Sequence, residues 1–365
     1  MKRILVIATR QIGDVLLTTP LIRATRARWP EARIEVMGFA GTLGMLQGNP
    51  DIDVLTETPS RLGWRGFWRL VRQHWRRHDL ALITQPGARP YLIGWIAARQ
   101  RSGLLPAHSG SNWWKRLMLD HVIEQSDDRG EVHVVAEKIR LLEPWATPSA
   151  PVPQVTAPPP APLPADVDSG VGDRAVVMHV PSMWNYKQWP VEHYRAVAQA
   201  LMASGYQVLL TGGPSDQAMV APVAELAPAP AMLNLAGRLS FAQLVTLMGR
   251  ARLYIGPDTS VSHLAAAVGV PVIAIFGPTN PMRWGPWPAS PQTLAPYERA
   301  ARVQRAGNIM LVQGPQPCVP CGRAGCEDHR NSRSDCLLSI KPETVTDLAL
   351  QRLHAGEEAR QPERS

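Results

Sequence analysis

Residues 253–267 read LYIGPDTSVSHLAAA, and this stretch decides the fold. Three apolar residues typical of a buried strand lead into a tight corner at Gly256 and Pro257. Asp258, Thr259 and Ser260 then offer side-chain oxygens that favour a helix start, and an alanine-rich helical stretch follows. Such a helix aims unpaired backbone N–H groups at whatever lies above the strand, which suits a diphosphate. An ordinary strand–turn–helix unit with a good cap explains the same residues equally well.

The alternation of short β-branched runs with longer helical stretches continues on both sides of this unit. It is typical of parallel sheets covered by helices, so we expect an α/β fold with two Rossmann-like domains facing each other across a cleft. The expected strands are 3–7, 33–37, 79–84, 175–180, 207–211, 252–255 and 272–276. The expected helices are 15–28 (kinked or restarted at Pro20), 191–204, 241–248, 260–268 and 342–354.

A connector dense in proline and alanine separates the two halves. It covers residues 144–164, includes three consecutive prolines and has few residues that could join a core. The 365 residues are enough for two domains of ordinary size. We therefore predict a first domain at 1–150, a linker at 151–170, a second domain at 171–345, and a C-terminal helix and tail at 346–365.

The chain carries 38 basic and 30 acidic residues, a formal net charge of +8. This excess favours phosphate-rich substrates, anionic membranes or nucleic acid, although a genomic preference for arginine explains much of it. The arginines are dispersed and no nucleic-acid-binding motif is present, so no nucleic acid is expected as a partner. No apolar run approaches the roughly 20 residues of a membrane span, and residues 1–7 are too short for a signal peptide. We expect a cytoplasmic protein.

Four polar segments follow expected strands, at 10–14, 181–189, 211–216 and 256–260. Ligands of such sheets bind beyond the carboxyl ends of the strands. In the first segment, Gly13 allows an unusual backbone angle and close approach of a ligand. Asp14 can act there as a general base on a hydroxyl group. Its spacing alone favours the alternative that Asp14 caps the following helix.

Two further residues could contact an anionic ligand. Lys187 lies in a tryptophan-rich segment before a helix that starts near Pro190, and a lysine there can reach an anionic leaving group as a mobile point charge. An ordinary surface lysine is the alternative. His263 lies one turn into the helix after Asp258, where it contacts the ligand or packs against a neighbouring loop.

Five motifs together resemble glycosyltransferase family 9, the heptosyltransferase family. They are IGDVLLTTP at 12–20, KQWP at 187–190, TGG at 211–213, DTSVSH at 258–263 and FGPTNP at 276–281. They stand in the family's order, and the resemblance extends from the first strand to about Val345. Residues 57–130 carry no motif that matches.

The resemblance implies a GT-B fold and an inverting transfer of heptose from ADP-heptose to the lipopolysaccharide core. Asp14 would deprotonate the acceptor hydroxyl. The residues implied in donor binding are Gly13, Lys187, Thr211, Gly212, Gly256, Asp258, Thr259, Ser260 and His263. Helix N-termini and Lys187 can meet the charge of the departing diphosphate, so no metal ion or other cofactor is expected for the chemistry.

Other functions fit the same motifs. The fold could use another nucleotide-sugar donor or a protein acceptor such as an autotransporter. A non-catalytic nucleotide-binding protein is a third interpretation, and the acid at Asp14 argues against it.

A tryptophan- and arginine-rich segment at 64–77, WRGFWRLVRQHWRR, predicts a helix with arginines on one face and aromatic residues on another. Our hypothesis is that it meets anionic sugar phosphates or the inner face of the inner membrane. The alternative is a solvated basic face over a packed aromatic one.

All four cysteines lie in one segment, at Cys318, Cys321, Cys326 and Cys336. Their spacing permits a structural four-thiolate Zn²⁺ or iron site. Similar cysteine-rich segments occur in the family that the chain resembles. Reduced thiols packing an irregular loop are the alternative, and a cytoplasmic location disfavours disulfides.

Overall fold

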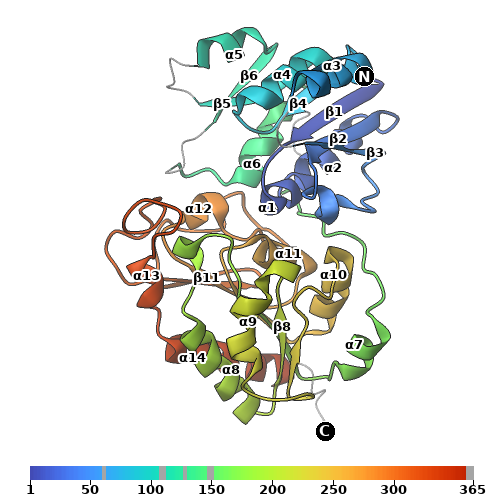
Figure 1. The fold of residues 1–365 in the computed structure, drawn as a ribbon. Helices are drawn as coiled ribbons and strands as arrows, with labels where there is room; N and C mark the ends of the chain where they lie inside the picture. Colours follow the sequence, from blue (N-terminus) through green and yellow to red (C-terminus); the bar gives the residue numbers. More distant parts are fainter. Residues whose placement is uncertain (60–62, 107–111, 126–129, 146–151, 359–365) are drawn as a thin grey trace. The chain divides into compact units, whose positions relative to one another are not determined.

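The computed structural model describes residues 1–59, 63–106, 112–125, 130–145 and 152–358 (Figure 1). The chain divides into two compact units. Unit 1 contains residues 1–159 and 291–295, and unit 2 contains residues 160–290 and 296–365. The predicted domain boundary at residue 150 and the tail at 359–365 lie outside the described residues.

Unit 1 is built on a six-stranded parallel sheet in the order β3-β2-β1-β4-β5-β6. Its strands are β1 Arg3–Ala8, β2 Arg33–Phe39, β3 Val54–Thr58, β4 His78–Ile83, β5 Ala98–Pro106 and β6 His121–Gln125. Its helices are α1 Ile12–Leu16, α2 Thr19–Arg28, α3 Trp64–His74, α4 Ala88–Ala97, α5 Trp113–Leu117 and α6 Val134–Ile139, with short 3₁₀ turns η1 Leu43–Leu46 and η3 Arg140–Trp145. The strand order reverses between β1 and β4, where Rossmann-like sheets bind ligands.

The residues of β1 alternate between two buried layers, because successive side chains of a strand point to opposite faces. Ile4 and Val6 pack with residues of α2 and η3, whereas Leu5 and Ile7 pack with residues of α3 and α4. The expected helix at 15–28 is two helices. α1 ends at Leu16 and α2 begins at Thr19 with Pro20 in its first turn, where a missing N–H costs nothing.

Unit 2 has a seven-stranded sheet in the order β12-β13-β11-β10-β7-β8-β9. Its strands are β7 Ala175–His179, β8 Gln207–Thr211, β9 Met232–Asn234, β10 Leu253–Pro257, β11 Val272–Phe276, β12 Val303–Ala306 and β13 Ile309–Gln313. All neighbours pair in parallel except β12 and β13. The order reverses between β7 and β10, as it does between β1 and β4 in unit 1.

The helices of unit 2 are α7 Ala165–Gly170, α8 Val191–Ala203, α9 Gln217–Ala224, α10 Phe241–Arg250, α11 Ser260–Val268, α12 Pro281–Trp284, α13 Asp335–Leu338 and α14 Pro342–Glu358, with 3₁₀ turns η4 Asn185–Lys187 and η5 Pro214–Asp216. α8 and α14 lie side by side (Figure 1). Both contribute to a core that also contains the fully buried Val176 of β7.

The proline-rich connector is more firmly held than its composition predicts. In its described part, Val155 and Leu163 are buried, so the connector contributes a few apolar side chains, as its composition predicts. The carbonyl of Ala161 accepts the Thr246 hydroxyl at 2.6 Å, and the carbonyl of Pro162 accepts the Gln243 amide at 3.1 Å. Proline lacks a backbone donor but keeps its carbonyl acceptor, which the contact of Pro162 uses. The expected linker also includes a helix, α7.

A membrane span requires a helix of sufficient length and apolar character. Among the helices of the described residues, none is both long and apolar enough to cross a bilayer.

Candidate functional site

In unit 1, Asp14 lies just beyond the carboxyl end of β1, at the point where the strand order reverses. It stands in the first turn of α1, and its side chain is 15% exposed. The Asp14 carboxylate is 3.9 Å from the guanidinium of Arg10. The N-cap position of α1 is Gln11, and no side chain makes a cap hydrogen bond there. Asp14 is therefore not a helix cap in this structure. Its partly exposed carboxylate is not used in capping and can face a ligand.

The backbone angle expected of Gly13 is wrong, whereas its role in donor binding stays a prediction. Gly13 is buried inside α1, and its carbonyl accepts the Leu17 N–H at 3.0 Å. It is not among the glycines with positive φ, so the unusual backbone angle expected of it is absent. The helix begins at Ile12, one residue earlier than Gly13, which places Gly13 in regular helical conformation.

Lys138 is a site residue that the sequence motifs do not reveal. This buried lysine of α6 donates to the backbone carbonyl of Asp14 at 2.6 Å and to the Thr18 hydroxyl at 3.0 Å. It therefore ties the middle of α1 to the start of α2. On the other side of the reversal point, Gln85 follows β4 and donates to the Thr9 hydroxyl at 2.8 Å.

In unit 2, Lys187 and Asp258 meet across the corresponding reversal point. Lys187 ends η4 in the loop after β7, and Asp258 directly follows β10. The Lys187 ammonium is 2.6 Å from the Asp258 carboxylate, and Asp258 is only 7% exposed. Burial is the largest single influence and raises the pKa of Asp258, but the charge and hydrogen bond of Lys187, together with a hydrogen bond from Thr279 and the charge of His263, outweigh it. The net result is an ionised carboxylate with a pKa below its ordinary value of 3.8.

The helix start at α11 differs from the expected cap. Thr259 occupies the N-cap position with extended backbone, but no side chain makes a cap hydrogen bond there. Asp258 is instead paired with Lys187, and Ser260 is the first residue of the helix. The first N–H groups of α11 are thus left without an intrahelical acceptor, as at any helix start. His263 is buried one turn into α11 and helps to lower the pKa of Asp258.

Packing constrains residues of the predicted polar segments at 211–216 and 256–260. Thr211 is buried, and its hydroxyl lies 3.0 Å from Nδ1 of His179. A side chain at Gly212 would press on Asp216 and Pro181. A side chain at Gly256 would collide with the Tyr254 ring and hydroxyl. The structure thus gives both glycines a packing role, and the binding roles expected of them stay predictions.

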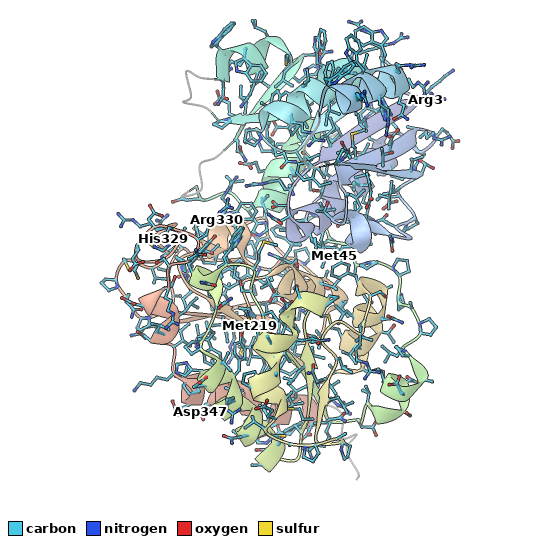
Figure 2. All side chains as sticks on the ribbon, viewed as in Figure 1. Arg3, Met45, Met219, His329, Arg330 and Asp347 are labelled. Carbon is cyan, nitrogen blue, oxygen red and sulfur yellow. The ribbon has the colours of Figure 1, made fainter. Side chains whose placement is uncertain are left out.

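The cysteine-rich segment at 318–336 packs on the loop that carries Lys187. The Ser334 hydroxyl donates to the Tyr186 carbonyl at 2.7 Å. The guanidinium of Arg330, labelled in Figure 2, lies over the Trp184 ring at 4.5 Å. Just beyond the segment, the carbonyl of Ile340 accepts the Trp189 indole N–H at 3.0 Å. These contacts fix both sides of Lys187.

The four cysteines are free thiols. Cys318 and Cys326 are exposed, and Cys336 is buried. Burial raises the pKa of Cys336 to about 12, and the neighbouring cysteines act in the same direction. In the described part of the chain, no three of these sulfur atoms come within 4.8 Å of one another. The arrangement as it stands does not form a four-thiolate site.

Comparison with known proteins identifies the family. The model of "Glycosyltransferase family 9 (heptosyltransferase)" matches residues 68–310, which include Lys187 and Asp258. The chain is 31% identical to lipopolysaccharide heptosyltransferase 3 of Escherichia coli, over 75% of this chain and 83% of that protein. It is 24% identical to lipooligosaccharide heptosyltransferase 2 of Haemophilus influenzae, over 96% of this chain and 98% of that protein.

A solved structure agrees with this assignment at the level of the fold. E. coli ADP-heptose lipopolysaccharide heptosyltransferase II superposes with a TM-score of 0.71 at 21% identity, covering 98% of this chain and all of that one. The two parallel-sheet units therefore form a GT-B fold, and the chain is an enzyme of the transferase class. The sequence, the two sheets and these relatives lead to one conclusion: this chain belongs to glycosyltransferase family 9, the heptosyltransferase family.

Proposed function

We propose that this enzyme moves heptose from ADP-heptose to the lipopolysaccharide core with inversion at the anomeric carbon. The observation that carries the proposal is the placement of polar residues in each unit. Asp14 and the Lys187–Asp258 pair lie beyond the carboxyl edge of their own sheets, where the strand order reverses. Relatives named as lipopolysaccharide and lipooligosaccharide heptosyltransferases support the sugar and the acceptor class.

In the proposed reaction, the Asp14 carboxylate removes the proton of an acceptor hydroxyl. The oxygen attacks the anomeric carbon of heptose, and the bond from that carbon to the diphosphate oxygen breaks. ADP departs with the electron pair of that bond, and one displacement inverts the configuration. Lys138 holds the backbone of Asp14, so the base is positioned before the acceptor arrives.

On the donor side, the diphosphate would lie at the start of α11. The N–H groups of Ser260, Val261 and Ser262, which precede the first intrahelical hydrogen bond, would point there together with the positive end of the helix dipole. The Lys187 ammonium, 2.6 Å from Asp258, would supply a positive charge for the phosphate oxygens. These groups would stabilise the negative charge of departing ADP.

The Asp14→Asn variant tests the base. We expect transfer from ADP-heptose to fall about 10²–10⁴-fold, the usual contribution of a general base, with ADP affinity nearly unchanged. The matched control is Asp51→Asn, the same change in unit 1 away from α1, which should transfer at the normal rate. Transfer within tenfold of the parent in Asp14→Asn would show that Asp14 is not the base.

A donor and acceptor comparison tests the substrates. ADP-heptose should be used far better than UDP- or GDP-sugars, and truncated core oligosaccharide should be glycosylated in preference to protein acceptors. Mass analysis of core oligosaccharide from a deletion strain would identify the residue that is added. Preference for another nucleotide or a protein acceptor would favour the alternative substrates of the same fold.

We further propose a cytoplasmic enzyme that touches the inner face of the inner membrane through α3 and its neighbours. Trp64, Trp68, Trp75 and Trp95 are exposed, and Trp75 and Trp95 contact each other edge to face. Phe67, Leu70 and Val71 are the α3 residues that pack inward. With the exposed Arg65, Arg69, Arg72 and Arg76, these four tryptophans form what we call the Trp-Arg surface. Exposed tryptophan beside arginine is the composition of an interfacial helix.

For the cysteines, we propose reduced thiols and a reaction that needs no metal. Within the described residues, no three of their sulfur atoms lie within 4.8 Å of one another, and the segment has the separate role of holding the Lys187 loop. Metal analysis of protein purified without a histidine tag tests this. An equivalent of zinc or iron that is lost on replacing the cysteines with serine would establish the metal site instead.

A further inference from the structure

Unit 1 contains a cluster of metal-ligand side chains at the amino edge of its sheet, the edge opposite Asp14. Glu35 comes from β2, His74 from the last turn of α3 and His78 from the start of β4. One oxygen or nitrogen from each lies within 4.8 Å of the other two. The three side chains are 15%, 12% and 5% exposed. Three separate elements therefore bring partly buried ligand atoms together.

The distances within the cluster suit a shared ion. Nε2 of His78 is 2.9 Å from Oε2 of Glu35, and Nδ1 of His74 is 3.8 Å from Oε1. Two ligand atoms of one tetrahedral zinc ion, each bound at 2.0–2.2 Å, lie about 3.4 Å apart. These two distances, measured to the two different oxygens of Glu35, bracket that separation. One ligand atom from each residue lies within 4.8 Å of the others, so modest side-chain movements would admit the ion.

The outer contacts of the cluster orient its ligands. Nδ1 of His78 lies 3.3 Å from the carbonyl of Ala97, and Oε1 of Glu35 accepts the Thr56 hydroxyl at 2.6 Å. Because a carbonyl is only an acceptor, the Nδ1 proton of His78 points to Ala97. With the Nδ1 proton directed at Ala97, Nε2 faces the Glu35 carboxylate at 2.9 Å, where a metal ion bound by both groups can take the place of a shared proton. A backbone carbonyl behind a histidine is a usual outer partner of a metal ligand.

A cavity of about 240 Å³ opens beside these ligands, which leaves room for a further ligand from solvent. Arg3, Arg33 and Arg77 line it with the cluster residues, and Figure 2 labels Arg3 at the start of β1. Arg3 and Arg33 are partners in the β1–β2 register. The positive charges of these arginines disfavour a weakly bound, hydrated cation. They favour an anion as the fourth ligand of a metal ion that the protein binds directly.

We propose that Glu35, His74 and His78 bind one divalent transition-metal ion of the Zn²⁺ type, with water or a small anion completing the coordination. Two imidazoles among three ligands select against Mg²⁺ and Ca²⁺, which prefer oxygen. The ion would link the C-terminal turn of α3 to β2 and β4, the two strands on either side of β1. It is a structural site that holds the helix bearing the Trp-Arg surface, and it takes no part in sugar transfer.

Zinc titration of the chelator-treated full-length protein tests the proposal, with binding followed by calorimetry. The four-cysteine serine variant removes competing thiols. Parallel titration of the parent with Co²⁺ distinguishes the sites if that variant does not fold, because thiolate ligands give intense near-ultraviolet charge-transfer bands and imidazole and carboxylate ligands do not. We expect one equivalent bound, with affinity reduced more than tenfold in His74→Gln and His78→Gln. His121→Gln, elsewhere in unit 1, is the matched control and should bind as the parent does.

Thermal unfolding provides a second measurement that does not depend on activity. Zinc should raise the Tm of the parent and of His121→Gln but not that of His78→Gln, since a ligand stabilises only the state that it binds. Binding by thiolates only, or affinity within threefold of the parent in both His74→Gln and His78→Gln, would overturn the proposal. Neither result would bear on whether Asp14 is the catalytic base.

Discussion

At the scale of single residues, Asp258 is a buried carboxylate whose ionised form depends on Lys187. The ion pair is short, and Asp258 is almost inaccessible, so removing the lysine leaves a buried charge without compensation. Breaking a buried pair from one side typically costs about 3–5 kcal/mol. The pair is therefore expected to matter for stability as well as for donor binding.

The Lys187→Met variant should reverse the pH dependence that Asp258 contributes. In the parent, the pKa of Asp258 is below its unfolded value of 3.8, so its contribution is present above that pH and is lost as the pH falls through the lowered pKa. Without Lys187, burial raises the pKa above the unfolded value, and stability is lost as the pH rises through it. Urea unfolding at pH 4.5 and 7.5 measures this. An equal loss of stability at both pH values would contradict it.

His179 predicts a second pH effect. Burial lowers its pKa to about 4 from an ordinary value of 6.5, although its bond to Thr211 acts in the opposite direction. The unfolded chain therefore takes up a proton below pH 6.5 that the folded chain refuses. The contribution of His179 to the free energy of unfolding is fully present above pH 6.5 and decreases toward pH 4. The slope is up to about 1.4 kcal/mol per pH unit. In His179→Asn, the free energy of unfolding should depend less on pH between 6.5 and 4. An unchanged pH dependence would refute the lowered pKa of His179.

At the scale of elements, the cysteine-rich segment supports the loop between β7 and α8. Ser334→Ala removes the hydrogen bond to Tyr186, next to Lys187. A lost hydrogen bond of about 1 kcal/mol should weaken donor binding roughly fivefold and leave kcat within twofold. Steady-state kinetics with varied ADP-heptose measures the two separately. Ser339→Ala, whose hydroxyl bonds Asp335 away from the loop, is the control; an equal effect there would show general loosening of the segment.

The elements also show what the sequence could predict. β8, β11 and α11 have the bounds that local periodicity predicted. By contrast, the segment at 64–77 is helical only to His74, and Arg76 has a φ of 46°, which no propensity reveals. Lys138 is linked to Asp14 across 124 residues. The Glu35–His74–His78 cluster likewise joins residues that only the folded sheet brings together. Local patterns specify elements, but contacts between distant elements need the tertiary structure.

At the scale of the whole molecule, the net charge of +8 would act together with the Trp-Arg surface at an anionic membrane. Charged residues near such a surface contribute about 1 kcal/mol each, and salt screens them. We predict that the enzyme co-sediments with vesicles containing anionic lipid and is released as ionic strength rises. Because the exposed tryptophans would insert into the bilayer, a fraction of the vesicle binding should persist at high salt.

Two triple variants separate the surface from the overall charge. Arg69→Glu, Arg72→Glu and Arg76→Glu lower the net charge from +8 to +2, because each reversal removes two charges. The same three-residue change at Arg302, Arg305 and Arg323, which are exposed in unit 2, gives the same net charge. If the Trp-Arg surface is the contact, the first variant binds anionic vesicles about a hundredfold more weakly and the second loses far less. If both variants lose vesicle binding equally, net charge alone explains the attraction. If neither loses vesicle binding, electrostatic attraction does not contribute to it.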